Sequence, residues 1–185
     1  MDRTRERITH AAVELHGTIG PAATTMSAVA ELAGVTRATL YRHFPTEEAL
    51  FTACSSDWLG ANPPPDPSSW ATVADPARRL ETALGDLYAY YRSTEQMRTN
   101  LLRDIAAIPP RFRSGIVAFP PTLVSILEIG WPEGSDARLR RAAIGHAVGF
   151  ETWRSLAKEG LTDEEAAELM VRFVTCIEPQ EKGKS

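Results

Sequence analysis

Apolar residues recur at steps of three and four positions along almost the whole of this 185-residue chain. That spacing lines one face of an α-helix, whereas a half-buried strand would alternate apolar and polar residues. We therefore expect an all-α protein of about nine helices. Threonines mark several helix starts, because a threonine hydroxyl accepts a hydrogen bond from a free amide of the first turn. Thr25, Thr36 and Thr46 are expected N-caps, and Thr162 with Glu165 forms the T-x-x-E pattern of a capping box.

A proline-rich stretch, GANPPPDPSSW, divides the chain. Four prolines fall between Asn62 and Pro67, and proline breaks helices because it lacks an amide hydrogen and fixes its own φ angle. We expect a domain on either side, a compact one over residues 1–58 and a larger helical one over residues 68–185. Longer helices are predicted in the second domain, beginning near Pro76, Thr94, Arg111, Ser135 and Thr162.

Bulk properties exclude several classes of protein. The hydrophobic fraction of 43% and the charged fraction of 24% are ordinary for a globular protein. No apolar run approaches the roughly 18 residues that cross a bilayer, and the N-terminal segment lacks the apolar core of a secretory signal. We therefore expect a cytoplasmic protein with no membrane partner. The net charge of −4 argues against indiscriminate nucleic-acid binding, so any contact with DNA has to be local.

The sequence lacks the residue patterns of common catalytic and metal sites. Its four histidines show no H-x-x-x-H or E-x-x-H spacing. Neither a G-x-S-x-G nucleophile motif nor a phosphate-binding glycine loop occurs. We expect a protein that is not an enzyme and that needs no metal or cofactor. Cys54 and Cys176 have no C-x-x-C spacing and are expected to be two buried thiols in a reducing compartment rather than a disulfide.

The segment AGVTRATLYRHFPTEEAL, residues 33–50, concentrates positive and hydrogen-bonding side chains on one very short helix. With the preceding helix, MSAVAELA, and a turn at Gly34, it has the helix-turn-helix pattern, in which the second helix lies in the major groove of DNA. Arg37, Thr39 and Arg42 then lie on the outer face, where an arginine can bind guanine through two hydrogen bonds. The residues expected to pack the two helices together are Val29, Leu32, Val35, Leu40 and Phe44.

Charge alone does not distinguish a DNA-reading face from an ordinary solvated helix. Residues 1–50 hold five arginines, no lysine and six acids, a net charge of 5 − 6 = −1. The order of the residues is more specific. Residues 24–50, TTMSAVAELAGVTRATLYRHFPTEEAL, resemble the DNA-binding unit of the TetR family of transcriptional regulators nearly position for position. The match includes the T-T start, the V-A-x-x-A-G-V-T core and the T-L-Y turn before Phe44.

This resemblance implies a three-helix DNA-binding unit, a C-terminal effector-binding and dimerisation domain, and a homodimeric repressor bound to a palindromic operator in double-stranded DNA. Where the family often has a basic residue at the start of the fourth helix, this chain has Glu47, which would remove a phosphate contact. Arg3, Arg5 and Arg7 are candidates to replace it from an N-terminal arm, unless so short an arm is disordered. The DNA contacts that the resemblance implies, with the outward Arg42 added, are Thr25, Thr36, Arg37, Thr39, Tyr41, Arg42 and His43.

Two helices near the C-terminus carry more apolar surface than one core face needs. The last helix keeps only a narrow polar stripe, and the helix after Ser135 has a strip of small residues that would let another helix approach closely. Surplus apolar surface favours a second copy related by two-fold symmetry. The resemblance likewise implies a dimer interface formed by the last two helices. The expected interface residues are Gly145, Gly149, Thr152, Leu156, Met170 and Val174.

Aromatic residues gather elsewhere in the second domain. Pro120 and Pro121 are expected to kink the helix that begins near Arg111 and to free carbonyls that a pocket can use. We expect a cavity for a small, mainly apolar effector, although aromatic stripes at helical spacing also occur as plain core. The expected lining is Tyr88, Tyr91, Met97, Leu101, Phe119, Leu123, His146, Phe150 and Trp153. The alternative function is a helical small-molecule-binding or interaction protein that has lost DNA binding, which Glu47 and the acidic first fifty residues would favour.

Overall fold

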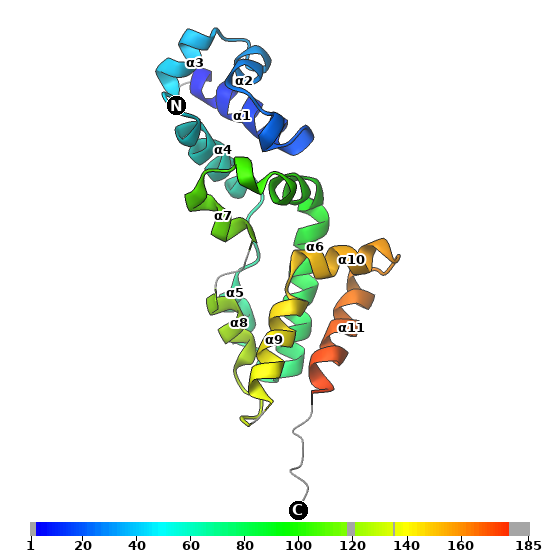
Figure 1. The fold of residues 1–185 in the computed structure, drawn as a ribbon. Helices are drawn as coiled ribbons and strands as arrows, with labels where there is room; N and C mark the ends of the chain where they lie inside the picture. Colours follow the sequence, from blue (N-terminus) through cyan, green and yellow to red (C-terminus); the bar gives the residue numbers. More distant parts are fainter. Residues whose placement is uncertain (1–2, 118–120, 135, 178–185) are drawn as a thin grey trace, which may run out of the picture. The chain divides into compact units, whose positions relative to one another are not determined.

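The structure of the chain, a computed structural model, describes residues 3–117, 121–134 and 136–177. These residues form α-helices joined by short connections, with two short 3-10 helices and no strand among them (Figure 1). The all-α class predicted from the sequence is therefore confirmed. The elements in chain order are α1 (Arg3–Thr18), η1 (Pro21–Ala23), α2 (Met26–Leu32), α3 (Arg37–His43), α4 (Glu47–Ala61), α5 (Pro67–Ala71), α6 (Pro76–Arg103), η2 (Ile105–Ala107), α7 (Pro110–Val117), α8 (Pro121–Glu128), α9 (Ala137–Ala147), α10 (Phe150–Lys158) and α11 (Asp163–Thr175).

The contacts within the chain divide it into two compact units. α6 contributes to both, because it runs without a break for 28 residues. The domain limits expected from the sequence, 1–58 and 68–185, stay a prediction. The N-terminal unit consists of Met1–Pro64 and Thr94–Val117, and the C-terminal unit of Pro65–Ser93 and Ala118–Ser185.

The N-terminal unit is built around α1, which packs against α2 and α4. The predicted N-caps are confirmed: the hydroxyls of Thr25, Thr36 and Thr46 accept hydrogen bonds from amides of the first turns of α2, α3 and α4. The predicted packing of Val29, Leu40 and Phe44 is also confirmed, since all three are buried, but Leu32 remains 46% exposed. The buried apolar core is Ile8, Ala11, Ala12, Met26, Val29, Ala30, Ala33, Leu40, Phe44, Leu50, Phe51, Cys54 and Ile108.

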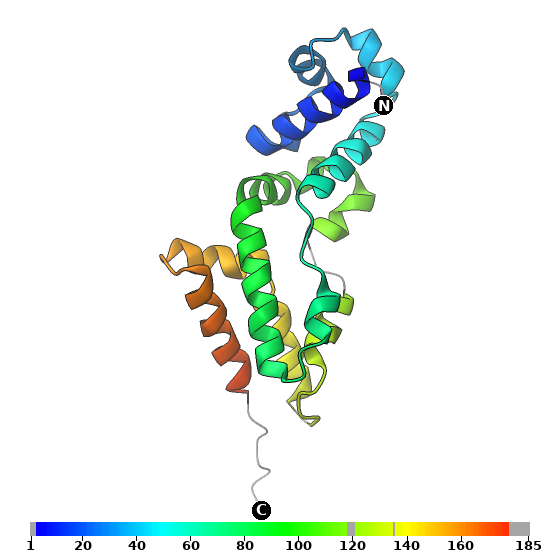
Figure 2. The same cartoon turned by 180° about the vertical axis from the view of Figure 1, so that it is seen from behind.

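The C-terminal unit is a small helical bundle. α9 contacts α8, α10 and α11, and α5 contacts α8. Figures 1 and 2, which view the chain from opposite sides, both show α9 and α11 beside the α6 rod. The predicted capping box of Thr162 and Glu165 opens α11, with both of its hydrogen bonds present. The largest fully buried side chains of this unit are Trp70, Leu80, Leu84, Leu87, Tyr88, Tyr91, Leu127 and Trp153.

Two helix limits predicted from the sequence are wrong. No helix begins at Thr94, because α6 continues through it and buries its side chain to 4% exposure. The helix predicted to begin near Arg111 is present as α7, and α8 follows at residues 121–128. Residues 118–120, where the kink was predicted, lie outside the described residues, so the kink stays a prediction.

The single helix predicted after Ser135 is instead two, α9 and α10, with a break at Val148 and Gly149. Two carbonyls at the break accept hydrogen bonds from side chains of α6 instead of from helix amides. The Tyr88 hydroxyl donates to the Ala147 carbonyl at 2.7 Å, and the Tyr91 hydroxyl donates to the Val148 carbonyl at 2.6 Å. The break is stable because these buried acceptors keep hydrogen-bond partners.

One thiol is placed as predicted and the other is not. Both cysteines are free, but Cys54 is buried whereas Cys176, just after α11, is exposed. Within the described ranges, no helix is both long and apolar enough to cross a membrane. The same residues contain no group of three or more histidine, cysteine or acidic side chains that could hold a metal ion.

Candidate nucleic-acid interface

The helix-turn-helix predicted from the sequence is formed by α2, α3 and the turn between them. Gly34 ends this turn in the left-handed region, with φ +62°, which a glycine adopts at little cost. The Val35 amide donates back to the Ala30 carbonyl at 2.9 Å and closes the turn. Leu40 and Phe44, both fully buried, fix the inner side of α3 against the core. This packing determines which residues of α3 lie on its outer side.

Basic and aromatic side chains occupy that outer side. Arg37 and Arg42 are exposed, and Tyr41 is 41% exposed. The Arg37 guanidinium carbon lies 6.0 Å from the centre of the Tyr41 ring, one turn further along. Neither arginine side chain is in an ion pair or hydrogen bond with another described residue. Both guanidinium groups are thus available to an external acceptor.

The threonines at the start of α3 form a short hydrogen-bonded chain. The Thr36 hydroxyl oxygen accepts from the Thr39 amide at 3.1 Å, and the same hydroxyl donates to the Thr39 hydroxyl oxygen at 3.0 Å. The Thr39 hydroxyl hydrogen then remains for an acceptor outside the helix. Thr25 is used in a similar way, capping α2 through the Ala28 amide at 3.1 Å. Thr25 and Thr36 are exposed caps, so their first role is to hold the helix ends.

The first turn of α4 carries two acids beside this face. Glu48 pairs with Arg111 of α7 at 2.8 Å, whereas Glu47 is exposed at the first position of the helix. Acids are favourable at this position because the N-terminal end of a helix carries partial positive charge. Glu47 therefore has a local structural reason to be acidic.

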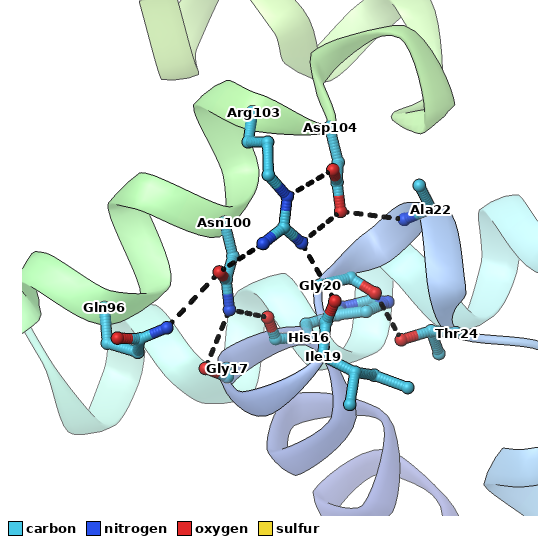
Figure 3. A network of polar contacts seen from close by, with 10 residues as sticks. All are labelled: His16, Gly17, Ile19, Gly20, Ala22, Thr24, Gln96, Asn100, Arg103 and Asp104. Atoms are coloured by element: carbon cyan, nitrogen blue, oxygen red, sulfur yellow. Dashed lines mark hydrogen bonds and ion pairs between the residues drawn. The ribbon is translucent and has the colours of Figure 1, made fainter.

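A polar network fastens the end of α1 to the end of α6 inside the N-terminal unit (Figure 3). We call it the α1–α6 clasp; its side chains are Asn100, Arg103 and Asp104. The Asn100 amide, 1% exposed, donates to the free carbonyls of His16 and Gly17 at 3.0 and 2.8 Å. These are carbonyls of the last turn of α1, which have no partner within the helix.

The clasp continues past α1 into the connection to α2. Arg103 donates to the Ile19 carbonyl at 2.9 Å and binds both carboxylate oxygens of Asp104, at 2.7 and 2.8 Å. Asp104 in turn accepts from the Ala22 amide at 3.1 Å. These hydrogen bonds, first of all that from Arg103, hold the pKa of the Asp104 carboxyl below its usual value. This network could not be predicted from the sequence, because its side chains bind backbone groups that lie 82 to 84 residues away.

A histidine and a cysteine meet in the core beneath the clasp. His16 Nδ1 lies 3.6 Å from Cys54 Sγ, and the His16 ring packs on Phe51 with centroids 5.5 Å apart. Burial lowers the pKa of His16 to about 4 and raises the pKa of Cys54 to about 12. Both groups are therefore neutral near pH 7, and the Cys54 thiol is unreactive.

Comparison with known proteins agrees with this geometry. Residues 8–54, which hold most of α1, all of α2 and α3 and the first half of α4, match the family model of bacterial regulatory proteins of the tetR family. The N-terminal residues 8–54 are therefore similar to the DNA-binding segment of tetR-family regulators. No curated protein sequence matches the chain.

The likeness to solved structures extends across both units. AibR, in complex with isovaleryl coenzyme A and operator DNA, has a TM-score of 0.64 and 23% identity, covering 93% of this chain and 97% of that one. A putative fatty acid metabolism regulator of Clostridium perfringens has a TM-score of 0.62 and 15% identity, covering 91% and 96%. NalD, the secondary repressor of the MexAB-OprM multidrug efflux pump in Pseudomonas aeruginosa, has a TM-score of 0.61 and 18% identity, covering 96% of each chain. At these identities the likeness establishes the shared fold alone.

The structure brings together four of the expected effector residues. Tyr88, Tyr91, Phe150 and Trp153 are buried. The Tyr91 ring lies 5.4 Å from Phe150 and 5.8 Å from Trp153, centre to centre. Burial also raises the pKa of the Tyr88 hydroxyl above its ordinary value. These four form a packed aromatic cluster at the α9–α10 break.

The other expected effector residues are not among these ring contacts, and one of them lies outside the described residues. Leu123 of α8 is buried in the C-terminal unit, whereas His146 is exposed. Met97 and Leu101 belong to the N-terminal unit, where Leu101 packs against the core. Phe119 lies outside the described residues. Effector binding by these residues stays a prediction.

The expected dimer residues vary in exposure. Gly145 is exposed; Gly149, Leu156 and Met170 are half-buried; and Thr152 and Val174 are buried. Thr152 donates its hydroxyl hydrogen to the His146 carbonyl at 2.6 Å and so belongs to the helix break. Large exposed apolar side chains of these helices lie at other positions, Leu139 of α9 and Leu169 and Phe173 of α11. The interface itself stays a prediction.

Proposed function

We propose that this chain is a DNA-binding transcriptional regulator of the TetR family, a cytoplasmic repressor that a small effector releases from its operator. The observation that carries the proposal is the outer side of α3. There Arg37, Tyr41 and Arg42 are exposed, and neither arginine has an ion-pair or hydrogen-bond partner among the described residues. A rigid two-turn helix that presents unpaired guanidinium groups is suited to hydrogen-bond acceptors in a DNA groove.

Each exposed side chain has a distinct role in this proposal. Arg37 opens α3 and reads a guanine through its O6 and N7 atoms. Tyr41 donates its hydroxyl to a phosphate, which positions the helix without reading sequence. Thr39, whose hydroxyl hydrogen is left over from the Thr36 cap, donates to a base edge or a phosphate. His43 and Arg42 complete the contact toward the end of the helix.

A second copy of the chain completes the operator complex. Leu169 and Phe173 are one turn apart on α11 and are 42% and 50% exposed. Together with Leu139 of α9, they leave apolar surface that a two-fold partner would cover. A two-fold dimer presents two copies of α3, so the operator is expected to be palindromic, with half-sites at least one helical turn apart.

The effector is proposed to be small and mainly apolar, and an acyl thioester of coenzyme A is the first class to test. The crystal structure of AibR contains isovaleryl coenzyme A together with operator DNA. In this chain, the candidate effector lining is the buried aromatic cluster of Tyr88, Tyr91, Phe150 and Trp153 at the α9–α10 break. To release DNA, the effector has to favour the non-binding state by a differential affinity of about 1–3 kcal/mol.

The DNA-binding part is tested by a mobility-shift titration with the DNA upstream of the chain's own gene. We expect a shifted complex that survives excess unrelated duplex, with a dissociation constant near 10⁻⁸ M or lower, against roughly 10⁻⁴–10⁻⁶ M for nonspecific DNA. The double variant Arg37→Ala with Arg42→Ala should lose the shift while keeping its helical circular dichroism. If unrelated DNA competes equally, the chain is instead an interaction protein that no longer binds DNA, as Glu47 would favour.

The effector part is tested on the same shifted complex. Isovaleryl coenzyme A is titrated in, with free coenzyme A as the matched control. Release by the thioester alone supports an acyl effector. Release by neither compound, or by both equally, would exclude this class of effector and leave the DNA result unaffected.

A further inference from the structure

Two arginines of α1 reach the ends of the two helices of the helix-turn-helix. Arg7 donates from Nε to the Ala33 carbonyl at 3.1 Å and from Nη2 to the same carbonyl at 2.5 Å. Its Nη2 also donates to the Gly34 carbonyl at 3.0 Å. The Arg7 fork is therefore fixed on the turn between α2 and α3.

Arg5 makes the corresponding contact at the far end of α3. Its Nη1 donates to the His43 carbonyl at 3.0 Å, and its guanidinium carbon lies 4.2 Å from the centre of the Phe44 ring. Phe44 is fully buried, so the guanidinium is held by a fixed aromatic face as well as by the carbonyl. The two arginines therefore connect α1 to the end of α2 with its turn and to the C-terminal end of α3.

The chemistry explains why arginine occupies both positions. The last carbonyls of a helix lack partners inside the helix and carry partial negative charge. Ala33 caps the end of α2, and His43 is the last residue of α3. A guanidinium satisfies such carbonyls with a positive charge and a planar fork, which a lysine ammonium does not reproduce. Neither helix, at 7 residues, has enough internal hydrogen bonds to hold its own orientation.

We propose that Arg5 and Arg7 are positioning residues that set the orientation of α3 for DNA, and not phosphate contacts. This proposal rests on the proposed DNA-binding function. The sequence predicts that both arginines belong to an N-terminal arm that either contacts phosphates or is disordered. In the structure α1 already begins at Arg3, and the donors of Arg5 and Arg7 are directed to protein carbonyls.

The dependence of DNA affinity on salt separates the two roles. Loss of one phosphate contact reduces the slope of log affinity against log salt concentration by about 0.9, because one fewer counterion is released on binding. A misplaced helix weakens binding but leaves this slope unchanged. The probe is a duplex that the wild-type chain selects from a randomised library. Variants are Arg7→Ala, Arg7→Lys and Arg5→Ala. Arg3→Ala is the comparison variant, since it removes the same charge from the same helix, and Arg3, which is exposed, remains the candidate phosphate contact of the three arginines.

We expect Arg7→Ala and Arg5→Ala to bind the probe at least tenfold more weakly than Arg3→Ala, with a wild-type salt slope, at a temperature where all variants are folded. Arg7→Lys should recover only part of the affinity. A slope reduced by about 0.9 per subunit in Arg7→Ala, with affinity close to that of Arg3→Ala, would overturn the proposal and make Arg7 a phosphate contact.

Amide hydrogen exchange tests the same clamp without DNA. The Gly34 and Val35 amides donate within the turn, to Glu31 and Ala30. Arg7→Ala should accelerate their exchange at least tenfold over Arg3→Ala, and equal exchange rates would contradict the clamp. If the wild type selects no duplex at all, the DNA-binding function fails, and the exchange result still decides whether Arg7 holds the turn.

Discussion

Replacing Gly20 with alanine should open the α1–α6 clasp. Gly20 has φ +91°, in the region that L-residues avoid, and this conformation costs a residue with a Cβ about 1–2 kcal/mol. A Cβ at this position would lie 2.0 Å from Arg103 Nη2 and 2.3 Å from Asp104 Oδ2, so both side chains would have to leave. Glycine is needed here because the backbone passes directly beneath the Arg103–Asp104 pair.

The expected loss follows from the strain together with the broken contacts. The Ala22 amide would lose its carboxylate acceptor, which, discounted for solvent screening, costs about 1 kcal/mol. The free energy of unfolding should therefore fall by about 2–3 kcal/mol. For a chain of this size that lowers the melting temperature by about 4–12 °C.

The assay is thermal and urea unfolding followed by circular dichroism, with Gly60→Ala as the matched control. Gly60 lies in α4 of the same unit, and a Cβ there meets nothing within 4 Å. Gly60→Ala should leave stability unchanged or raise it by roughly 0.5–1 kcal/mol, because alanine favours helix. If Gly20→Ala is as stable as Gly60→Ala, the clasp does not hold α1 to α6 and the reasoning is wrong.

Two further predictions concern the core and the dimer. Burial lowers the pKa of His16 to about 4 in the folded chain, below its ordinary value of 6.5. The unfolded chain therefore binds more protons between these values, so stability is constant above pH 6.5 and falls as the pH drops toward 4, by at most about 3 kcal/mol. His16→Leu should flatten the urea-unfolding stability measured from pH 6.5 to pH 5, and an unchanged pH dependence would contradict the assignment. Phe173→Asp should convert the proposed dimer to monomers in sedimentation velocity, whereas Thr175→Asp, an exposed change on the same helix, should not; a dimeric Phe173→Asp variant would show that another face is used.

Features specified by neighbouring residues could be predicted from the sequence. The caps at Thr25, Thr36 and Thr46 depend on a hydroxyl and an amide three positions later, and the capping box at Thr162 has the same short range. The positive φ of Gly34 is likewise a local requirement of the turn. Such features are set by chemistry within one helical turn, so no knowledge of the tertiary structure is needed.

Features that depend on distant partners could not be predicted. The break between α9 and α10 is held by the hydroxyls of Tyr88 and Tyr91, which are 59 and 57 residues away from the carbonyls they bind. The apolar periodicity continues through the break, so the sequence suggested one helix. Asn100 of the clasp is 84 residues from His16, and nothing in its local sequence distinguishes it from a solvated polar residue. Sequence periodicity reports which face is buried, not which acceptor a buried donor will meet.

Selection from a randomised duplex library tests whether the outer side of α3 reads DNA sequence. Wild type and Arg37→Ala are selected in parallel at one fixed salt concentration, because affinities at different salt are not comparable. We expect a two-fold symmetric site for the wild type. For Arg37→Ala we expect loss of preference at one guanine in each half-site, with discrimination there reduced roughly tenfold or more. Enrichment of no site by the wild type, or of the same site with undiminished preference by Arg37→Ala, would contradict this expectation.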